Sequence, residues 1–303
     1  MSTQRAWLID ASIYIFRAWF SLPDRWQTKD GWPVHAVYGY TSFLLDFIDD
    51  AGPGEHCAAA FDESLGSCYR NDILASYKAS RELPDDALAF QLRACKEVTQ
   101  RLGMPCYGGS RYEADDYLAS LARLFQERNI PVSVVTRDKD LGQIMQGPQD
   151  HWLDFAGRVT LNAEGFRDKF GVRPNQFADY LALVGDPTDD IPGVPGIGAK
   201  TAARLLQAFD NLATLEQDFE RVAELDIRGA KGVSQRLQEH WPQLLVARQL
   251  TGLEAYIPEV TELPKFRLEA ENIESVIEYL EELGIGGPLT RRLEKLGRRL
   301  SLL

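Results

Sequence analysis

The run "AWLID" (residues 6–10) places four apolar residues before a single aspartate, and a similar pattern occurs twice more. The apolar runs "CAAAF" (57–61) and "VSVVT" (132–136) are followed by Asp62 and by "RDKD" (137–140). Runs of this length predict buried strands, whereas 36–48 and 115–128 carry apolar residues at helical spacing. The alternation predicts an α/β fold with a mostly parallel central sheet and helices on both faces.

The pattern divides the chain into two parts. "HWLDF" (151–155) and "RVTL" (158–161) predict a hairpin around Gly157, within an α/β domain over residues 1–173. From about residue 174 the strand signals fade, and helices are indicated at 175–185, 199–209, 234–250 and 273–284. Because no low-complexity linker intervenes, the helical region 174–303 is expected to pack against the first part.

Composition limits the class of protein. With 303 residues, 45% hydrophobic and 26% charged, the chain is typical of a soluble globular protein of one large or two ordinary domains. No apolar run approaches the roughly 18 residues of a membrane span, and no signal peptide is visible. The cysteines show no CxxC pairing and predict reduced thiols in a cytoplasmic protein: Cys57, Cys68, Cys95 and Cys106.

Acidic residues gather where a site would form. In an open parallel sheet, sites lie beyond the carboxyl ends of the strands, where Asp10, Asp62, Asp138 and Asp140 are expected. "YEADDY" (112–117) adds Glu113, Asp115 and Asp116 at a helix start, and the helical region adds Asp186, Asp189 and Asp190. A single acid at a strand end is unremarkable, and a single acid at a helix N-terminus is usually a cap, but so many unpaired carboxylates together would be destabilising.

Such a cluster predicts divalent cations with oxygen ligands, namely two or more Mg²⁺ or Mn²⁺ ions. Zinc is disfavoured because no His or Cys accompanies the acids. Bound cations would also answer the objection that a net charge of −12 disfavours nucleic-acid binding.

The glycine run "GVPGIGAKTA" (193–202) follows the last acids directly. A phosphate-binding P-loop is disfavoured because Lys200 follows Ala199 rather than a glycine, and because no strand is predicted before the loop. The dinucleotide motif fails as well, since no third glycine follows Gly196 and Gly198 at the required spacing.

The polar segment between Phe61 and Leu88 is long for a connection and holds Arg70, Lys78 and Arg81. Long connections are usually functional or mobile, and a solvated surface helix is the alternative.

Together these motifs resemble the 5′-nuclease family, which comprises the 5′→3′ exonuclease domain of bacterial DNA polymerase I, the bacteriophage 5′-nucleases and the flap endonucleases. The resemblance covers nearly the whole chain and rests on "LIDASIYIFRAWF" (8–20), "AVYGYTSFL" (36–44), "AAFDESLGSCYRNDILASYKASR" (59–81), "YEADDYLASLA" (112–122), "VTRDKDLGQI" (135–144) and "ADYLALVGDPTDDIPGVPGIGAKTAARLL" (178–206). With no room for a polymerase domain, the chain resembles a stand-alone member.

The resemblance implies a role for each acid. Around a first metal it places Asp10, Asp62, Glu113, Asp115 and Asp116; around a second, Asp138, Asp140, Asp186 and Asp189. All are retained, which favours an active enzyme. Asp190 departs from the Asn usual in the polymerase relatives. Lys139 is expected to face solvent or a phosphate.

The family also assigns the two remaining segments. Residues 64–86 correspond to its helical arch over the 5′ single strand, where Lys78, Arg81 and Arg70 would act on the scissile phosphate as catalytic residues. Tyr77 would stack on a base or serve packing. Residues 190–207 resemble a helix-hairpin-helix that holds a duplex phosphate, with a K⁺ ion, through Gly193, Gly196, Gly198, Lys200 and Thr201; a simple helix connection is the alternative. The basic "RRLEKLGRR" (291–299) would touch duplex backbone or be a solvated helix end.

The implied function is a structure-specific, metal-dependent 5′-nuclease. Its substrates would be DNA with a free 5′ end, at flaps, overhangs, nicks and gaps, and it would act as a monomer without a membrane partner. One alternative is a ribonuclease that removes RNA from RNA–DNA primers at 5′ ends. The other is a catalytically silent module that binds DNA junctions.

Overall fold

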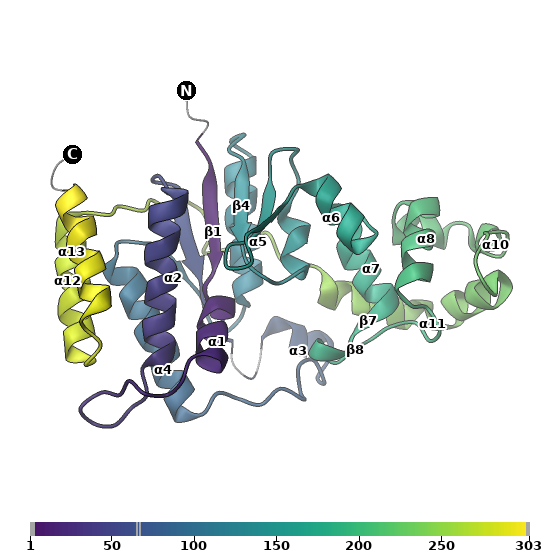
Figure 1. Ribbon diagram of the computed structural model, residues 1–303. Coiled ribbons are helices and arrows are strands. Elements are labelled where there is room, and N and C mark those ends of the chain that lie inside the picture. The colour runs from purple at the N-terminus through teal and green to yellow at the C-terminus, as the bar shows by residue number, and fades with distance from the viewer. Residues whose placement is uncertain (1–3, 65, 67, 301–303) are drawn as a thin grey trace.

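The computed structural model of the protein describes residues 4–64, 66 and 68–300. Predictions that extend over residues 1–3, 65, 67 and 301–303 lie outside the described residues at those positions. Among the described residues a six-stranded sheet has the order β3–β2–β1–β4–β5–β6 (Figure 1). The strands are β1 (Ala6–Asp10), β2 (Cys57–Ala60), β3 (Cys106–Tyr107), β4 (Val132–Val135), β5 (His151–Asp154) and β6 (Val159–Leu161).

Strands β1 to β5 run parallel, and β6 forms an antiparallel hairpin with β5. The predicted fold class and the hairpin around Gly157 are therefore confirmed. Strand β3 was not predicted, because two residues are too few to show an apolar pattern.

Each face of the sheet has its own hydrophobic core. Leu8 and Val134 belong to one core, whereas their chain neighbours Ile9 and Val135 belong to the other, as side chains alternate along a strand. The second face is covered by α1 (Ala11–Ser21), α2 (His35–Ala51) and α4 (Asp86–Arg101). The first is covered by α5 (Ala114–Gln126), the 3₁₀ helix η1 (Asp140–Ile144) and α7 (Phe177–Val184).

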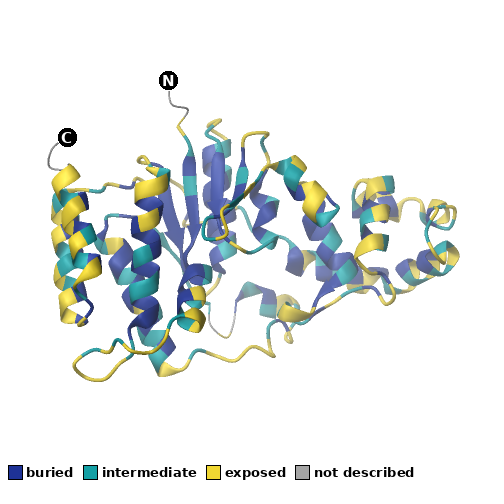
Figure 2. Ribbon diagram, in the orientation of Figure 1, coloured by how far each residue is buried: buried dark blue, intermediate teal, exposed yellow. Residues whose placement is uncertain are grey.

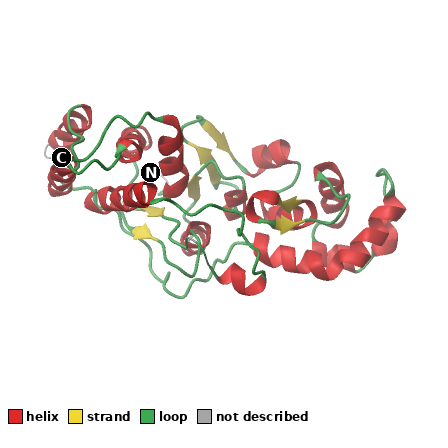
Figure 3. Ribbon diagram, turned by 90° about the horizontal axis from the view of Figure 1, so that it is seen from below, coloured by secondary structure: helices red, strands yellow, loops and turns green. Residues whose placement is uncertain are grey.

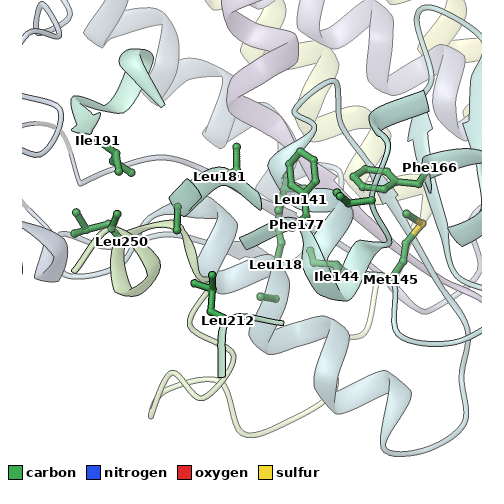
Figure 4. Close-up of a cluster of buried hydrophobic side chains, with 14 of the residues drawn as sticks. Leu118, Leu141, Ile144, Met145, Phe166, Phe177, Leu181, Ile191, Leu212 and Leu250 are labelled. Carbon is green, nitrogen blue, oxygen red and sulfur yellow. The ribbon is translucent and has the colours of Figure 1, made fainter. Parts of the chain in front are cut away.

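The core on the α5 side positions the helix that precedes the last acids (Figure 4). Leu118 of α5, Leu141 of η1 and Phe177 of α7 are fully buried there. Burial of each such side chain stabilises the fold by roughly 1.5–3 kcal/mol. Phe166, from α6 (Ala163–Phe170), packs so closely on Gly142 that a Cβ atom at 142 would stand 2.1 Å from its ring. Only glycine fits at that position.

The helical region extends from the sheet toward one end of the molecule. It contains η2 (Pro174–Gln176), α7, η3 (Pro187–Asp189), α8 (Ala199–Phe209), α9 (Leu212–Glu216), α10 (Phe219–Val222) and α11 (Ala230–Thr251). It also contains a two-stranded ribbon, β7 (Gly185–Asp186) with β8 (Ile191–Pro192). The prediction that no strand precedes the glycine run was therefore wrong, since β8 ends directly before Gly193. Because β8 pairs with β7 outside the main sheet, the ribbon does not provide the context of a P-loop.

The last two helices return to the other end of the molecule (Figures 1 and 3). Helices α12 (Ala270–Glu282) and α13 (Pro288–Leu300) pack on α4 and α2, and their buried residues Ile273, Leu280 and Leu293 join the core of that face. Their outer faces are exposed (Figure 2). The division near residue 174 remains a prediction, but these two helices pack with the first part of the chain.

Among its described residues, the segment 64–86 contains the short helix α3 (Tyr69–Ile73) and, at Asp86, the start of α4; the others lie in turns, a bend and irregular chain. None of the helices in the described part of the chain is long and apolar enough to cross a membrane.

Candidate active site

Three parallel strands deliver acids to one edge of the sheet. Asp10 is the last residue of β1, Asp62 follows β2, and Asp138 lies in the turn after β4. Because β1 pairs in parallel with both β2 and β4, these carboxyl ends lie side by side. The sheet therefore brings the strand-end acids to one edge, as predicted.

Asp10 is held by two hydrogen bonds. Its Oδ1 accepts the Ile13 N–H at 3.3 Å, which caps α1, and its Oδ2 accepts the Thr136 hydroxyl at 2.8 Å. Burial, with the nearby charges of Asp138 and Asp62, raises the pKa of Asp10 to about 7. Burial also raises the pKa of Asp62 and of Asp115, the latter well above its ordinary value.

These acids lack cationic partners. Among the described residues, no Lys or Arg forms an ion pair with Asp10, Asp62, Asp115 or Asp138. The raised pKa values of Asp10, Asp62 and Asp115 reflect the same fact, because a carboxylate that is desolvated and unpaired favours its protonated form. When these carboxyls are ionised, no cationic side chain offsets their negative charge.

The remaining acids are paired, and the first pair is buried. Arg70, only 2% exposed, donates to both carboxylate oxygens of Asp116 at 2.7 Å and to Glu113 at 2.9 Å. It also donates to the carbonyls of Leu250 and Gly252, beyond which the chain leaves α11. Arg70 was predicted to act on the scissile phosphate; the structure places it behind the carboxylates, where it joins α3, α5 and the end of α11.

Tyr77, Lys78 and Arg81 lie over the site from the 64–86 segment. The buried Tyr77 hydroxyl donates to Glu113 at 2.8 Å and to Asp189 at 3.3 Å, and the choice between stacking on a base and packing stays a prediction. The Lys78 ammonium pairs with Glu113 and lies 3.7 Å from Asp189, and Arg81 pairs with Asp189 at 2.6 Å. Although burial opposes it, the charges of Lys78 and Arg70 lower the pKa of Glu113.

Lys139 joins the last two acids. Its ammonium lies 3.0 Å from Asp140 and 3.5 Å from Asp186, rather than facing solvent alone. Burial and the charge of Asp138 still raise the pKa of Asp140 to about 7. Asp138 thus influences both Asp10 and Asp140, and the predicted assignment of the acids to two separate ions remains a prediction.

Two hollows adjoin the cluster. A cavity of about 30 Å³ is lined by Lys78, Glu113, Asp115, Asp140, Asp186 and Asp189. A larger one of about 680 Å³ lies between α1 and the 64–86 segment, with aromatic walls from Phe16, Trp19 and Phe20 beside Asp62 and Arg81. In the described part of the chain, no group of three or more His, Cys, Asp or Glu side chains is disposed to ligate one ion.

The glycine run forms one exposed turn between β8 and α8. Val194 and Ile197 are buried and anchor the turn, while Gly196 adopts a φ of +74°, which favours glycine. A Cβ atom at Gly193 would stand 2.3 Å from the Val184 carbonyl oxygen. Helix α8 begins after Gly198 without a side-chain cap, and the exposed Lys200 and the half-buried Thr201 follow in its first turn. All five predicted residues are brought together.

Sequence models of a known family match almost the whole of this arrangement. The model described as "5'-3' exonuclease, N-terminal resolvase-like domain" matches residues 5–171, more than half of the chain. The chain belongs to the 5′-3′ exonuclease family. The model described as "5'-3' exonuclease, C-terminal SAM fold" matches residues 172–274 of the helical region. The resemblance stated from the sequence is confirmed.

Relatives within the family include polymerases and a stand-alone protein. The chain is 35% identical over 280 residues to DNA polymerase I of Pseudomonas aeruginosa, covering 91% of this chain and 30% of the polymerase. It is 28% identical to a 5'-3' exonuclease of Buchnera aphidicola, covering 83% of this chain and 86% of that protein. The chain therefore spans about a third of the polymerase relatives and most of the exonuclease.

Solved structures share the family fold. A bacteriophage T5 flap endonuclease in a complex with DNA and metal ions superposes with a TM-score of 0.66 at 17% identity, covering 97% of this chain and 99% of that one. The catalytic core of Rad2 with a DNA substrate superposes with a TM-score of 0.62 at 17% identity, covering 98% and 92%. At this identity the likeness concerns the fold.

Three functional contacts were not predicted from the sequence. Thr136 donates to Asp10 and accepts the Asp138 N–H at 2.9 Å, so one hydroxyl links the ends of β1 and β4. Ser12 accepts the Asp62 N–H at 2.9 Å, and Asp190 accepts the Ser80 N–H at 2.8 Å. Hydroxyl residues at strand ends carry no pattern of their own, so only the topology reveals the first two.

Proposed function

We propose that this chain is a metal-dependent 5′-nuclease that hydrolyses phosphodiester bonds near the 5′ end of DNA flaps, overhangs, nicks and gaps. The observation that carries the proposal is the convergence of nine acids, from three strand ends, α5 and the β7–β8 ribbon, beside an exposed glycine turn. Two solved structures of the same fold are described with DNA, one of them also with metal ions, which supports these partners for this chain.

The carboxylates fit divalent cations. Asp10, Asp62, Asp115 and Asp138 are oxygen donors with surplus negative charge, which suits Mg²⁺ or Mn²⁺. With them, Glu113, Asp140, Asp186 and Asp189 would hold the ions, whereas Arg70 occupies both oxygens of Asp116. Bound cations would supply the Lewis acidity that phosphodiester hydrolysis needs.

The chain's own residues would hold the single strand. Lys78 and Arg81 lie at the boundary between the acids and the 680 Å³ hollow, where they would pair with the phosphate to be cut and stabilise its developing charge. The aromatic side chains of that hollow would accept a nucleotide beside the phosphate. Arg70 and Thr136 would keep the carboxylates in position.

The glycine turn would hold the duplex. The uncapped N–H groups at the start of α8 and the charge of Lys200 suit one backbone phosphate, without reading its sequence. A K⁺ ion at this turn is part of the same proposal. We infer further that the protein acts as a monomer in the cytoplasm, where its DNA substrate lies.

One panel of substrates tests the function against its alternatives. The 5′-labelled DNA flaps, overhangs, nicks and blunt ends should be cut in Mg²⁺, and EDTA should abolish cutting. Faster cutting of a matched flap with a 5′ RNA segment would favour the ribonuclease. Tight junction binding without cutting in Mg²⁺ or Mn²⁺ would favour the silent module.

A further inference from the structure

The 77–81 turn is tied to the loop after β7 by three hydrogen bonds. The Lys78 N–H donates to the Asp189 carbonyl at 3.1 Å, the Ser80 N–H to the Asp190 carboxylate at 2.8 Å, and the Arg81 Nε to the Thr188 carbonyl at 3.4 Å. These contacts join the segment after β2 to the helical region, near the positions of α3 and β8 in Figure 1.

The turn is strained and must be held in place. Lys78 adopts a φ of +53°, a conformation that residues with a Cβ atom rarely take. The contacts with Asp189 and Asp190 therefore compensate for an unfavourable backbone. Asp190 itself has a φ of +56°, which Asp and Asn tolerate best, and its carboxylate is the acceptor that Ser80 uses.

In this position both carboxylate oxygens of Glu113, and both of Asp189, are in contact with side chains of the turn. Glu113 contacts Lys78 through one oxygen and Arg70 and Tyr77 through the other. Asp189 contacts Arg81 through one oxygen and Tyr77 and Lys78 through the other. The cavity beside them is only about 30 Å³. A cation could ligate Glu113 or Asp189 only after the ammonium and guanidinium groups withdrew, because like charges repel in so small a space.

We propose that Asp190 is a positioning residue that latches the 77–81 turn onto the cluster, where Lys78 and Arg81 neutralise Glu113 and Asp189 until divalent cations displace them. The inference rests on the proposed function, since it concerns the same acids. It gives Asp190, the one departure from the family motif, a role that Asn could share, because an amide oxygen also accepts the Ser80 N–H.

The test measures Mn²⁺ affinity by calorimetry and the amide exchange of Lys78 and Ser80, on the EDTA-treated full chain. Mn²⁺ should accelerate exchange at both amides at least about tenfold, because it opens the turn. Lys78→Met should bind Mn²⁺ about tenfold more tightly, since the competing ammonium is gone. The matched control Lys96→Met, which removes a lysine paired with Glu63 outside the cluster, should bind as the wild type does.

The Asp190 variants separate the latch from plain electrostatics. Asp190→Ala should expose the Ser80 amide and tighten Mn²⁺ binding severalfold, whereas Asp190→Asn should behave as the wild type although it loses the same charge. Unchanged exchange on Mn²⁺ binding, or weaker binding by both Lys78→Met and Asp190→Ala, would overturn the latch while DNA cutting in Mg²⁺ still supported the nuclease. Absence of Mn²⁺ binding by every variant would overturn both.

Discussion

Asp10 serves two purposes at once. Its carboxylate caps α1 and also stands at the head of the unpaired acids, where burial raises its pKa to about 7. A charge in this position is costly without a counterion, and the chain provides none among the described residues. The fold therefore accepts a local instability that a bound cation would remove.

That instability predicts a pH dependence in the metal-free protein. The folded state binds the Asp10 proton more tightly than the unfolded chain does, because folding raises the pKa of Asp10 from its ordinary 3.8 to about 7. The stability from this proton is present below about pH 4 and is lost as the pH rises through 7. Asn keeps the cap, so Asp10→Asn should gain stability relative to the wild type across this window, by up to about 4 kcal/mol.

Urea unfolding of both proteins in EDTA at several pH values measures this difference. A constant difference from pH 4 to 8 would contradict the buried, unpaired state of Asp10. Saturating Mg²⁺ should reverse the order of the two proteins at pH 8, because it binds only the native site of the wild type with full strength.

The variants Asp138→Asn and Asp189→Asn should differ in stability, although we expect both to lose most of the cutting activity. Asp138 has no cationic partner, so Asp138→Asn should leave the melting temperature in EDTA unchanged or higher. Asp189 pairs with Lys78 and Arg81, so Asp189→Asn should lower it. Both should reduce cutting of a labelled flap by several orders of magnitude. Near-normal cutting by Asp138→Asn would be the decisive negative result.

At the residue scale, position in the chain was enough to predict most of the site. The acids could be found because strand ends meet at one edge and because the motifs resemble a family. The burial of Arg70 could not be predicted, because a basic residue in a polar segment is expected to be exposed. Only the structure shows that the end of α11 covers it.

At the scale of elements, the β7–β8 ribbon explains why acids and glycines are neighbours. Asp186 pairs with Ile191 and Gly185 with Pro192, so a single ribbon carries the last acids at one side and leads into the glycine turn at the other. The long helices and apolar strands were predictable from the spacing of their apolar residues alone. Ribbons of two-residue strands were not, because they are held by backbone pairing and by the packing of Gly193 on Val184.

The glycine turn should affect binding rather than chemistry. Lys200→Ala should weaken duplex affinity similarly for all sequences and reduce the slope of log K against log salt by about 0.9, the value for one phosphate contact. The single-turnover rate at saturating enzyme should change little. The control Lys295→Ala removes an exposed lysine of α13 at the opposite end of the molecule and should leave the salt slope unchanged. Loss of chemistry with intact binding would refute the assignment.

Helix α13 should matter for stability more than for DNA. Arg292 and Arg299 pair with Asp46 and Asp49 of α2, so two of the five basic residues of α13 already have acidic partners in the protein. Leu293 is fully buried, and Leu293→Ala should lower the free energy of unfolding by roughly 2–5 kcal/mol. Cutting measured well below the melting temperature should be normal. A loss of duplex affinity in Arg298→Ala, with unchanged stability, would instead indicate a DNA contact by this helix.

At the scale of the whole molecule, the site lies where the two parts of the chain meet. The sheet supplies one set of acids and the ribbon the other, and Arg70 and the 77–81 turn connect them. The glycine turn lies beyond this junction, and α12 and α13 lie on the far side of the sheet (Figure 1). A DNA molecule held at the glycine turn could thus place a second strand at the acids, under the 64–86 segment.

This arrangement predicts that the enzyme senses a free 5′ end. Lys78 and Arg81 lie over the acids, so we expect a single strand to pass beneath their segment to reach the proposed metal site. A bulky block on the 5′ end of a flap, added before the enzyme, should strongly inhibit cutting. The same block added after the enzyme has bound in Ca²⁺ should trap the DNA, and Mg²⁺ should then permit cutting.

The double variant Lys78→Ala/Arg81→Ala tests the same path of the single strand by changing the protein instead of the DNA. Its chemical step should slow by a larger factor than its duplex affinity falls, because the proposed duplex contact, the glycine turn before α8, lies in the other part of the chain. Lys96→Ala with Arg93→Ala, on α4, removes the same number of charges outside the site and serves as the control. If blocked and free flaps are cut equally and the double variant keeps its rate, the strand does not pass beneath this segment, and the closed turn is only a structural connection between the two parts of the chain.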